Sequence, residues 1–258
     1  MRKSKTLAKL RAGQSVRVCG LGHFIPSYAS LAAHFGFDCI WLDAEHRTFN
    51  DREIQSLLAY CHQYDIDCML RPATLEKTRL YRYLEDGAAG LMIPFVSTPE
   101  KARMLVDAVK FPPLGDRGLD GVGQDCGLIL RGDEFVDHAN RETFLVAQIE
   151  TPQAVENIDA IAAVEGVDVV FIGPADLGLR LRRTETPLTL DDAIDKVAAA
   201  AQRHGKAWGC TAPSPERVGQ LRDRGARFIG YGGDYLALRD MLSRVSGELD
   251  EVYGKPSS

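Results

Sequence analysis

The sequence lacks several features that would assign it to other classes of protein. No apolar run reaches the roughly 18 residues that a membrane-spanning helix needs. The basic stretch at residues 1–18 lacks the apolar core of a secretory signal. The six cysteines form no C-x-x-C motif and no closely spaced pair, so they predict neither a metal site nor a disulfide framework. We therefore expect a soluble, cytoplasmic protein with reduced, buried cysteines.

Two further absences concern charge and nucleotide motifs. The net charge of the 258 residues is −5, and acidic and basic residues are interspersed. No basic face or arm stands out, so we expect no nucleic-acid partner and, with no apolar span, no membrane partner. No G-x-G-x-x-G motif follows the first apolar run, which disfavours a doubly wound dinucleotide-binding sheet.

Eight short apolar runs alternate with longer amphipathic stretches. The runs cover residues 15–20, 38–43, 67–71, 90–94, 144–150, 168–173, 206–210 and 227–232. They are too short and too apolar for exposed antiparallel strands and are typical of buried parallel ones. Three of the stretches begin with Ser or Thr followed by Pro, at 98, 151 and 214, as helix starts do. The pattern predicts a single α/β domain over residues 1–258, a (β/α)8 TIM barrel.

In such a barrel, chemistry takes place at the carboxyl ends of the strands. Ionisable and polar residues gather there in this sequence. They are Asp43, Glu45 and His46 after the second run, Arg71 after the third, Gln148 and Glu150 after the fifth, and Asp176 in the Gly-Pro-Ala-Asp turn after the sixth. One long Gly- and Pro-rich gap, residues 111–143, has the length of a functional loop.

Glu150 and Asp176 follow adjacent strands, so their carboxylates are expected to lie close together. Bare, they would repel, and one would have to take up a proton. A divalent cation removes the conflict, and an all-oxygen site without cysteine suits Mg²⁺ or Mn²⁺. The alternative from spacing alone is that each carboxylate caps the following helix or pairs with a lysine.

Arg71 and His46 are the other candidates for chemistry. The fork of Arg71 suits a carboxylate or a developing oxyanion, although a buried structural ion pair explains it equally well. His46 titrates near neutrality and could act as a base, or it could be structural. His23, after the first strand, lies on the same face, and we interpret it as structural.

With these residues assembled, the sequence resembles the metal-dependent (class II) hydroxy-oxo-acid aldolases of the HpcH/HpaI aldolase family. The resemblance extends over about residues 5–245. It is carried by GFDCIWLDAEH, by RP at 71–72, by GAAGLMIPFV, FPPLGDRG and GARFIGYGGD, and above all by QIETPQAVENIDAIAAVEGVDVVFIGPADL. It implies a barrel of the phosphoenolpyruvate/pyruvate type.

The family cleaves 4-hydroxy-2-oxo acids reversibly to pyruvate and an aldehyde, in the catabolism of aromatic compounds or sugar acids. The resemblance implies a divalent metal (Mg²⁺ or Mn²⁺, with Co²⁺ as a further candidate) that acts as a Lewis acid on the pyruvate enolate. It implies that Glu150 and Asp176 bind this metal and that Asp43 holds a water on it. It implies that Arg71 stabilises the enolate oxygen.

The remaining roles also follow from the resemblance. His46 would be the base, and Gln148 would belong to the substrate site. The backbone N–H groups of Ala175 and Asp176 would hold the pyruvate carboxylate, as the start of a helix can.

The sequence departs from the family pattern in two places. The base histidine of the family is supported by an aspartate after strand three, and Glu85 stands at that position here. The segment RGLDGVGQDCG, after residue 116, also differs. We expect this loop to shape the aldehyde pocket or to pack across a subunit interface.

Two other functions remain open. One is a lyase similar to citrate lyase β or malyl-CoA lyase, although no basic site for coenzyme A is evident. The other is a non-catalytic homologue that binds metal and oxo acid. The resemblance further implies a homo-hexamer, a trimer of dimers, with C-terminal helices exchanged between subunits. The segment 234–254 could do this through Leu236, Met241, Leu242 and Val245, or it could pack on its own barrel. The aldehyde partner is not predictable from these residues.

Overall fold

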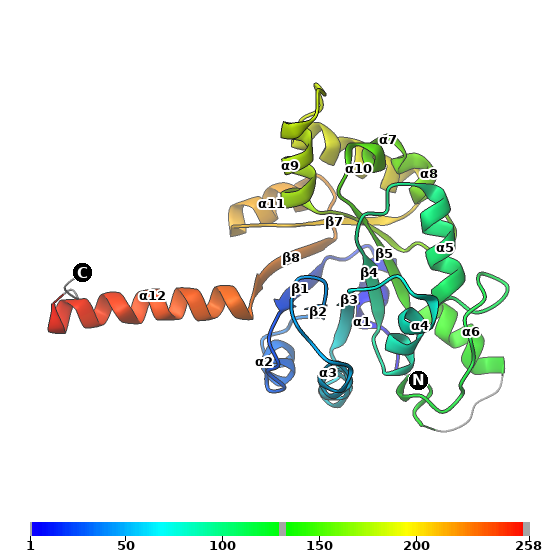
Figure 1. The fold of residues 1–258 in the computed structure, drawn as a ribbon, viewed down its shortest axis with the longest axis horizontal. Helices are drawn as coiled ribbons and strands as arrows, with labels where there is room; N and C mark the ends of the chain where they lie inside the picture. The colour runs from blue at the N-terminus through cyan, green and yellow to red at the C-terminus, as the bar shows by residue number, and fades with distance from the viewer. Residues whose placement is uncertain (1, 129–132, 255–258) are drawn as a thin grey trace.

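The predicted barrel is confirmed in a computed structural model, which describes residues 2–128 and 133–254. Eight parallel strands pair in chain order, and β1 also pairs with β8, so the sheet is closed (Figure 1). Each predicted run corresponds to one strand, with ends that agree to within one residue. The strands are β1 (Val16–Leu21), β2 (Cys39–Asp43), β3 (Asp67–Arg71), β4 (Gly90–Ile93), β5 (Phe144–Ile149), β6 (Val169–Ile172), β7 (Ala207–Thr211) and β8 (Phe228–Gly233).

Helices connect the strands and surround the barrel. They are α1 (Lys5–Arg11), α2 (Tyr28–His34), α3 (Asp51–Gln63), α4 (Lys77–Glu85), α5 (Pro99–Val109), the 3₁₀ turn η1 (Gln124–Cys126), α6 (Asp133–Glu142), α7 (Pro152–Glu156), α8 (Ile158–Ala162), α9 (Pro174–Arg183), α10 (Leu190–Arg203), α11 (Pro215–Asp223) and α12 (Asp234–Tyr253). The three predicted helix starts are confirmed, because Thr98, Thr151 and Ser214 each accept a backbone N–H of the first turn.

Two segments differ from the simple alternation of strand and helix. The stretch after β5 forms two short helices, α7 and α8, which meet at Asn157. The side-chain amide of Asn157 donates to the carbonyl of Ser97 at 2.8 Å and so fixes this break against the β4–α5 connection. The long gap contains η1 and α6 rather than only loop, and residues 129–132 within it lie outside the described part of the chain.

The core has two layers because alternate strand residues point inward and outward. Inside the barrel, the rings of Phe144, Phe171 and Phe228 meet edge to face, with centroids 6.1 and 6.3 Å apart. A Cβ at residue 90 would lie 2.4 Å from the Phe144 ring, so a glycine is needed at this position to leave room for the ring. The outer faces of the strands form a larger apolar layer with the helices. All six cysteines are buried, as predicted.

The amino end of the barrel is closed by the first residues of the chain. Asp67, at the start of β3, is fully buried. Its carboxylate accepts the hydroxyl of Ser4 at 2.7 Å and the N–H of Thr6 at 2.8 Å, and it pairs with Arg2 at 2.6 Å. Leu7 of α1 packs against the interior cluster. These contacts cover the amino end of the interior cluster.

The last helix does not pack on its own barrel. α12 leaves the end of β8 and projects away from the rest of the molecule (Figure 1). Its apolar side chains are exposed, among them Leu236, Met241 and Leu242. Of the two alternatives for this segment, the structure therefore excludes packing on the same chain. Neither α12 nor any other helix within the described residues is long and apolar enough to cross a membrane.

The interior phenylalanines should dominate the stability of the barrel. We expect Phe144→Ala to lower the free energy of unfolding by about 3–5 kcal/mol, because it leaves a cavity in a closed interior. Phe35→Ala is the matched control, since Phe35 is 64% exposed and its loss should cost well under 1 kcal/mol. Urea denaturation followed by circular dichroism measures both variants. Equal midpoints for the two would contradict this account of the core.

Candidate active site

The predicted site residues come together at the carboxyl end of the barrel because their side chains point inward. On β2, the inward positions are Cys39, Trp41 and Asp43. On β3, the inward positions alternate in the same way and end at Arg71. On β5, the same alternation places Gln148 inside and Glu150 just beyond the strand. The alternation of strand residues thus selects the polar side chains that enter the mouth of the barrel.

Arg71 is held between two carboxylates and an aromatic ring. Its Nε and Nη2 donate to the two oxygens of Asp43 at 3.0 and 2.8 Å, and its Nη1 lies 3.0 Å from Glu45. Its guanidinium lies 4.7 Å from the centroid of the Trp41 ring. Burial raises the pKa of the Asp43 carboxyl, but the hydrogen bonds and charge of Arg71 outweigh it and hold this pKa below its usual value. The arginine is therefore fixed in position and Asp43 is ionised.

Glu150 is the most deeply buried carboxylate of the site, with 3% of its surface exposed. It accepts the N–H of Phe95 at 3.0 Å and the side-chain amide of Gln148 at 2.8 Å. Burial and the nearby charges of Asp176 and Glu45 raise the pKa of the Glu150 carboxyl to about 7, although the bond from Phe95 opposes this. The site thus holds an acidic group that is close to losing its charge.

Gly173 gives Glu150 its space. A Cβ on residue 173 would lie 2.3 Å from Oε1 of Glu150, so any side chain there would displace the carboxylate. The next residues begin α9, whose first backbone bond runs from Leu177 N–H to Gly173 C=O. The N–H groups of Ala175 and Asp176 precede that bond and point out of the helix start, where an anion can accept them.

Asp176 lies in the first turn of α9, about one-third exposed, and pairs with Arg180 at 2.5 Å. Its charge is close enough to Glu150 to raise the pKa of that carboxyl. Two mutually repelling carboxylates form an all-oxygen donor pair. Such a pair fits Mg²⁺ or Mn²⁺.

His46 stands at the rim of the site. Its side chain is 54% exposed, and its Nε2 lies 3.4 Å from Glu45. Its backbone N–H donates to Asp43 at 3.3 Å, which fixes the turn after β2. The structure therefore brings His46 to the same end of the barrel as Arg71, with Glu45 as its nearest carboxylate.

Glu85 is not brought to His46 within one chain. It is the last residue of α4, which runs from the carboxyl end of β3 back to the amino end of β4. His46 follows β2 at the opposite end of the barrel. Within one chain, Glu85 therefore does not pair with His46, because α4 carries it to the other end of the barrel.

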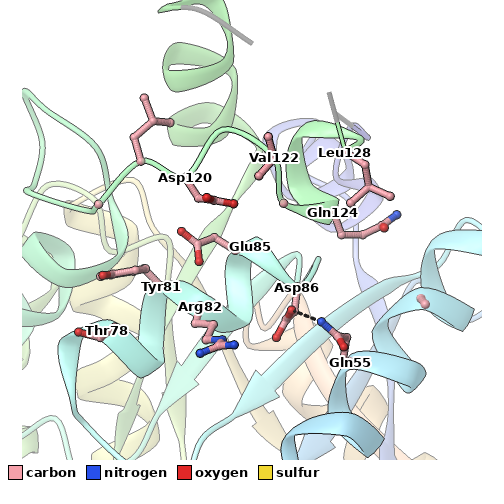
Figure 2. Close-up of a pocket in the computed structure, with 14 residues that line it drawn as sticks. Gln55, Thr78, Tyr81, Arg82, Glu85, Asp86, Asp120, Val122, Gln124 and Leu128 are labelled. Atoms are coloured by element: carbon pink, nitrogen blue, oxygen red, sulfur yellow. Dashed lines mark hydrogen bonds between the residues drawn. The ribbon is translucent and has the colours of Figure 1, made fainter. Parts of the chain in front are cut away.

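Glu85 instead faces a separate cavity of about 680 Å³ on the outside of the barrel. Figure 2 shows Glu85, at the end of α4, facing the segment that carries Asp120 and Val122. Asp86, the residue after the helix, points the other way and accepts the side-chain amide of Gln55 at 2.7 Å. Burial raises the pKa of the Glu85 carboxyl, partly offset by the charge of Arg117. The loop at 118–128 thus packs on α3 and α4.

A second cavity, of about 310 Å³, opens at the mouth beside Arg71. β1 and β8 contribute glycines to it, including Gly20, Gly22 and Gly230, and β2 contributes Trp41 as a floor. The missing side chains leave room next to Arg71 for a substrate. Trp41, Phe95 and Arg180 also contact the candidate site residues. They were not predictable from the sequence, because an aromatic residue or a helical arginine gives no pattern until the strands are placed.

Comparisons with known proteins agree with this geometry. The model of the family described as HpcH/HpaI aldolase/citrate lyase matches residues 21–240. The chain is 32% identical to a hydroxypyruvate/pyruvate aldolase of Pseudomonas aeruginosa, over 97% of this chain and 94% of that protein. It is 34% identical to a 2-keto-3-deoxy-L-rhamnonate aldolase of Salmonella paratyphi B, over 83% of this chain and 81% of that protein.

Solved structures extend the similarity to three dimensions. A crystal structure of an HpcH/HpaI aldolase from Desulfitobacterium hafniense superposes with a TM-score of 0.88 and 33% identity, over 96% of this chain and 98% of that one. The aldolase relatives and the family match together cover nearly the whole chain and make it a carbon–carbon lyase. The chain therefore belongs to the HpcH/HpaI aldolase/citrate lyase family.

Proposed function

We propose that this protein is a divalent-metal-dependent aldolase that cleaves a 4-hydroxy-2-oxo acid to pyruvate and an aldehyde, and that also runs the reverse addition. The observation that carries the proposal is the pair of carboxylates, Glu150 and Asp176, at the mouth that also holds the fixed guanidinium of Arg71. Relatives named as pyruvate and sugar-acid aldolases support this substrate class.

In this proposal the metal, when bound by Glu150 and Asp176, supplies Lewis-acid stabilisation of a 2-oxo group and its enolate. Arg71 presents its charge to the same oxygen. Its position is set in advance by Asp43 and Glu45, so little reorganisation is needed when negative charge develops. Asp43, ionised by the same contact, is available to orient a water.

The pyruvate carboxylate would accept the N–H groups of Ala175 and Asp176 at the start of α9. Gln148 would face the substrate through its unpartnered Oε1. Fixing both ends of the oxo acid directs its reacting carbon toward the mouth cavity, where the aldehyde part has room.

His46 is our candidate for the base that moves the proton of the aldol hydroxyl. It is exposed at the rim, and Glu45 is the carboxylate near enough to orient its ring. Because α4 carries Glu85 to the other end of its own barrel, support from Glu85 requires a second copy of the chain.

The first prediction tests the pyruvate half of the reaction without the unknown aldehyde. The protein, stripped with EDTA and then given Mg²⁺ or Mn²⁺, should exchange the methyl protons of pyruvate for deuterium, as followed by NMR. Glu150→Ala should abolish the exchange because it removes a metal ligand. Arg71→Ala should slow it by about 10²-fold or more, because the enolate oxygen loses a fixed donor.

Glu156→Ala and Arg52→Ala are matched controls on the exposed surface, and they should exchange at the wild-type rate. Absence of exchange by the folded wild-type protein with every divalent metal would favour the non-catalytic homologue.

The second prediction concerns pH and the metal-free protein. The folded-state pKa of Glu150, about 7, lies above the usual value of 4.5, so folding favours its protonated form. The stability contributed by the protonated form is present below about pH 4.5 and is lost as pH rises through 7.

In EDTA, the free energy of unfolding of the wild-type protein should therefore fall between pH 5 and 8, by about 1–3 kcal/mol relative to Glu150→Gln. Urea denaturation at several pH values measures this difference. Parallel pH profiles for the two proteins would contradict the assigned environment of Glu150.

The exposed apolar face of α12 supports an oligomer. We infer a homo-hexamer, a trimer of dimers in which α12 packs on a neighbouring subunit. Size-exclusion chromatography with light scattering should give the mass of six chains of 28.4 kDa each. Leu242→Glu should dissociate the assembly, because Leu242 is 61% exposed in the single chain. Leu75→Glu, at an exposed site outside α12, is the control, and a monomeric wild-type protein would refute the assembly.

A further inference from the structure

The two proposed metal ligands are linked to each other through Phe95 and Arg180. Phe95, directly after β4, has a φ of +53°, a left-handed conformation that is unfavourable for a bulky residue. This conformation aims its N–H at Glu150, 3.0 Å away. The same residue places its ring against Arg180, whose guanidinium carbon lies 4.8 Å from the ring centroid. Arg180 in turn pairs with Asp176.

The connection that holds Phe95 is itself fixed. The ammonium of Lys101 donates to the carbonyls of Pro94 and Phe95, both at 3.0 Å. The left-handed residue is therefore retained by contacts on both sides, which is how a strained conformation persists near a site. The ring of Phe95 thus provides Arg180 with a stacking contact that does not depend on Asp176.

Arg180 forms an ion pair with the carboxylate of Asp176, the group proposed to bind the metal. Its Nη1 donates to Oδ1 of Asp176 at 2.5 Å and lies 3.3 Å from the backbone carbonyl of the same residue. Within residues 2–128 and 133–254, Asp176 is its only acidic partner. The other arginine of the site, Arg71, is engaged by Asp43 and Glu45 instead.

The Arg180–Asp176 ion pair can open readily, so that another cation can replace Arg180 on the carboxylate. Both side chains are about one-third exposed, and they lie one helical turn apart on α9. Ion pairs of this kind contribute little net free energy and are readily exchanged. A divalent cation on Asp176 would also repel the guanidinium, which could remain stacked on Phe95 after it releases the carboxylate.

We propose that Arg180 is a tethered counter-cation that occupies Asp176 in the metal-free protein, competes with the divalent metal for it, and so sets the metal affinity of the site. The inference rests on the proposed function only in taking Glu150 and Asp176 as metal ligands. It predicts whether the metal affinity rises or falls when the charge of Arg180 is removed. An arginine that merely supports a ligand strengthens metal binding, and its loss costs about 10- to 100-fold in affinity. A competing arginine weakens metal binding.

The experiment is a Mn²⁺ titration of EDTA-stripped full-length protein, by electron paramagnetic resonance of free Mn²⁺ and by calorimetry. Arg180→Met keeps the length and packing of the side chain and removes its charge. We expect its Kd for Mn²⁺ to be about two- to fivefold lower than that of the wild type, the factor that an exposed ion pair represents. Arg180→Lys retains the charge and should keep the wild-type Kd within a factor of two.

Arg183→Met is the matched control, because Arg183 is an exposed arginine at the end of the same helix. It should leave the Kd unchanged. A second measurement is the rise in Tm on adding Mn²⁺. This rise should be larger in Arg180→Met than in the wild type, because without metal the variant leaves the two carboxylates uncompensated.

The possible results separate the two proposals. An equal or higher Kd in Arg180→Met, with normal binding by the wild type, overturns the role of Arg180 and leaves the metal site intact. A wild-type protein that binds no Mn²⁺ overturns both. An equal decrease in Kd for Arg183→Met would reduce the effect to the general charge of α9 and would also overturn the proposal.

Discussion

The burial of the Glu150 carboxylate is the constraint on which the rest of the site depends. An ionised carboxylate inside a barrel is unfavourable unless hydrogen bonds or a cation compensate it. The structure supplies two donors, from Phe95 and Gln148, and leaves out the side chain at Gly173 that would occupy the same space. These contacts hold Glu150 in position, but burial and the charges of Asp176 and Glu45 outweigh them and raise its pKa. A divalent cation would compensate the charge that burial disfavours.

Arg71 shows the complementary arrangement. It is a buried cation fixed from three sides, by Asp43, Glu45 and the ring of Trp41. The charge of Arg71 is thus balanced locally. Removing one group leaves another buried charge without its partner, which is why the site behaves as a unit rather than as a set of independent residues.

Much of the fold followed from the sequence, because the signals for parallel strands are local. Eight apolar runs and the Ser/Thr-Pro helix starts predicted the barrel, and the position of polar residues after the runs predicted Asp43, Arg71, Gln148, Glu150 and Asp176 at one end. The role of Glu85 stays a prediction from the resemblance, because the direction of α4 separates it from His46 within one chain. Phe95 and Arg180 were not predictable, because their contacts join segments far apart in the chain.

Several features have no explanation within a single chain, and all of them lie on its outer surface. The cavity at Glu85, the loop at 118–128 with its exposed Leu119 and Val122, and the apolar side chains of α12 have no function inside a single barrel. They lie outside the mouth and away from the proposed metal ligands. The proposed chemistry belongs to the mouth of the barrel, while the apolar side chains of these outer segments are exposed in the single chain.

The closure of the amino end by Asp67 and the first helix has a kinetic consequence. Ser4, Thr6 and Arg2 hold that end shut, and the interior phenylalanines fill the barrel between it and the mouth. In the proposed reaction, both fragments of a cleaved substrate must then leave through the mouth by which the substrate entered.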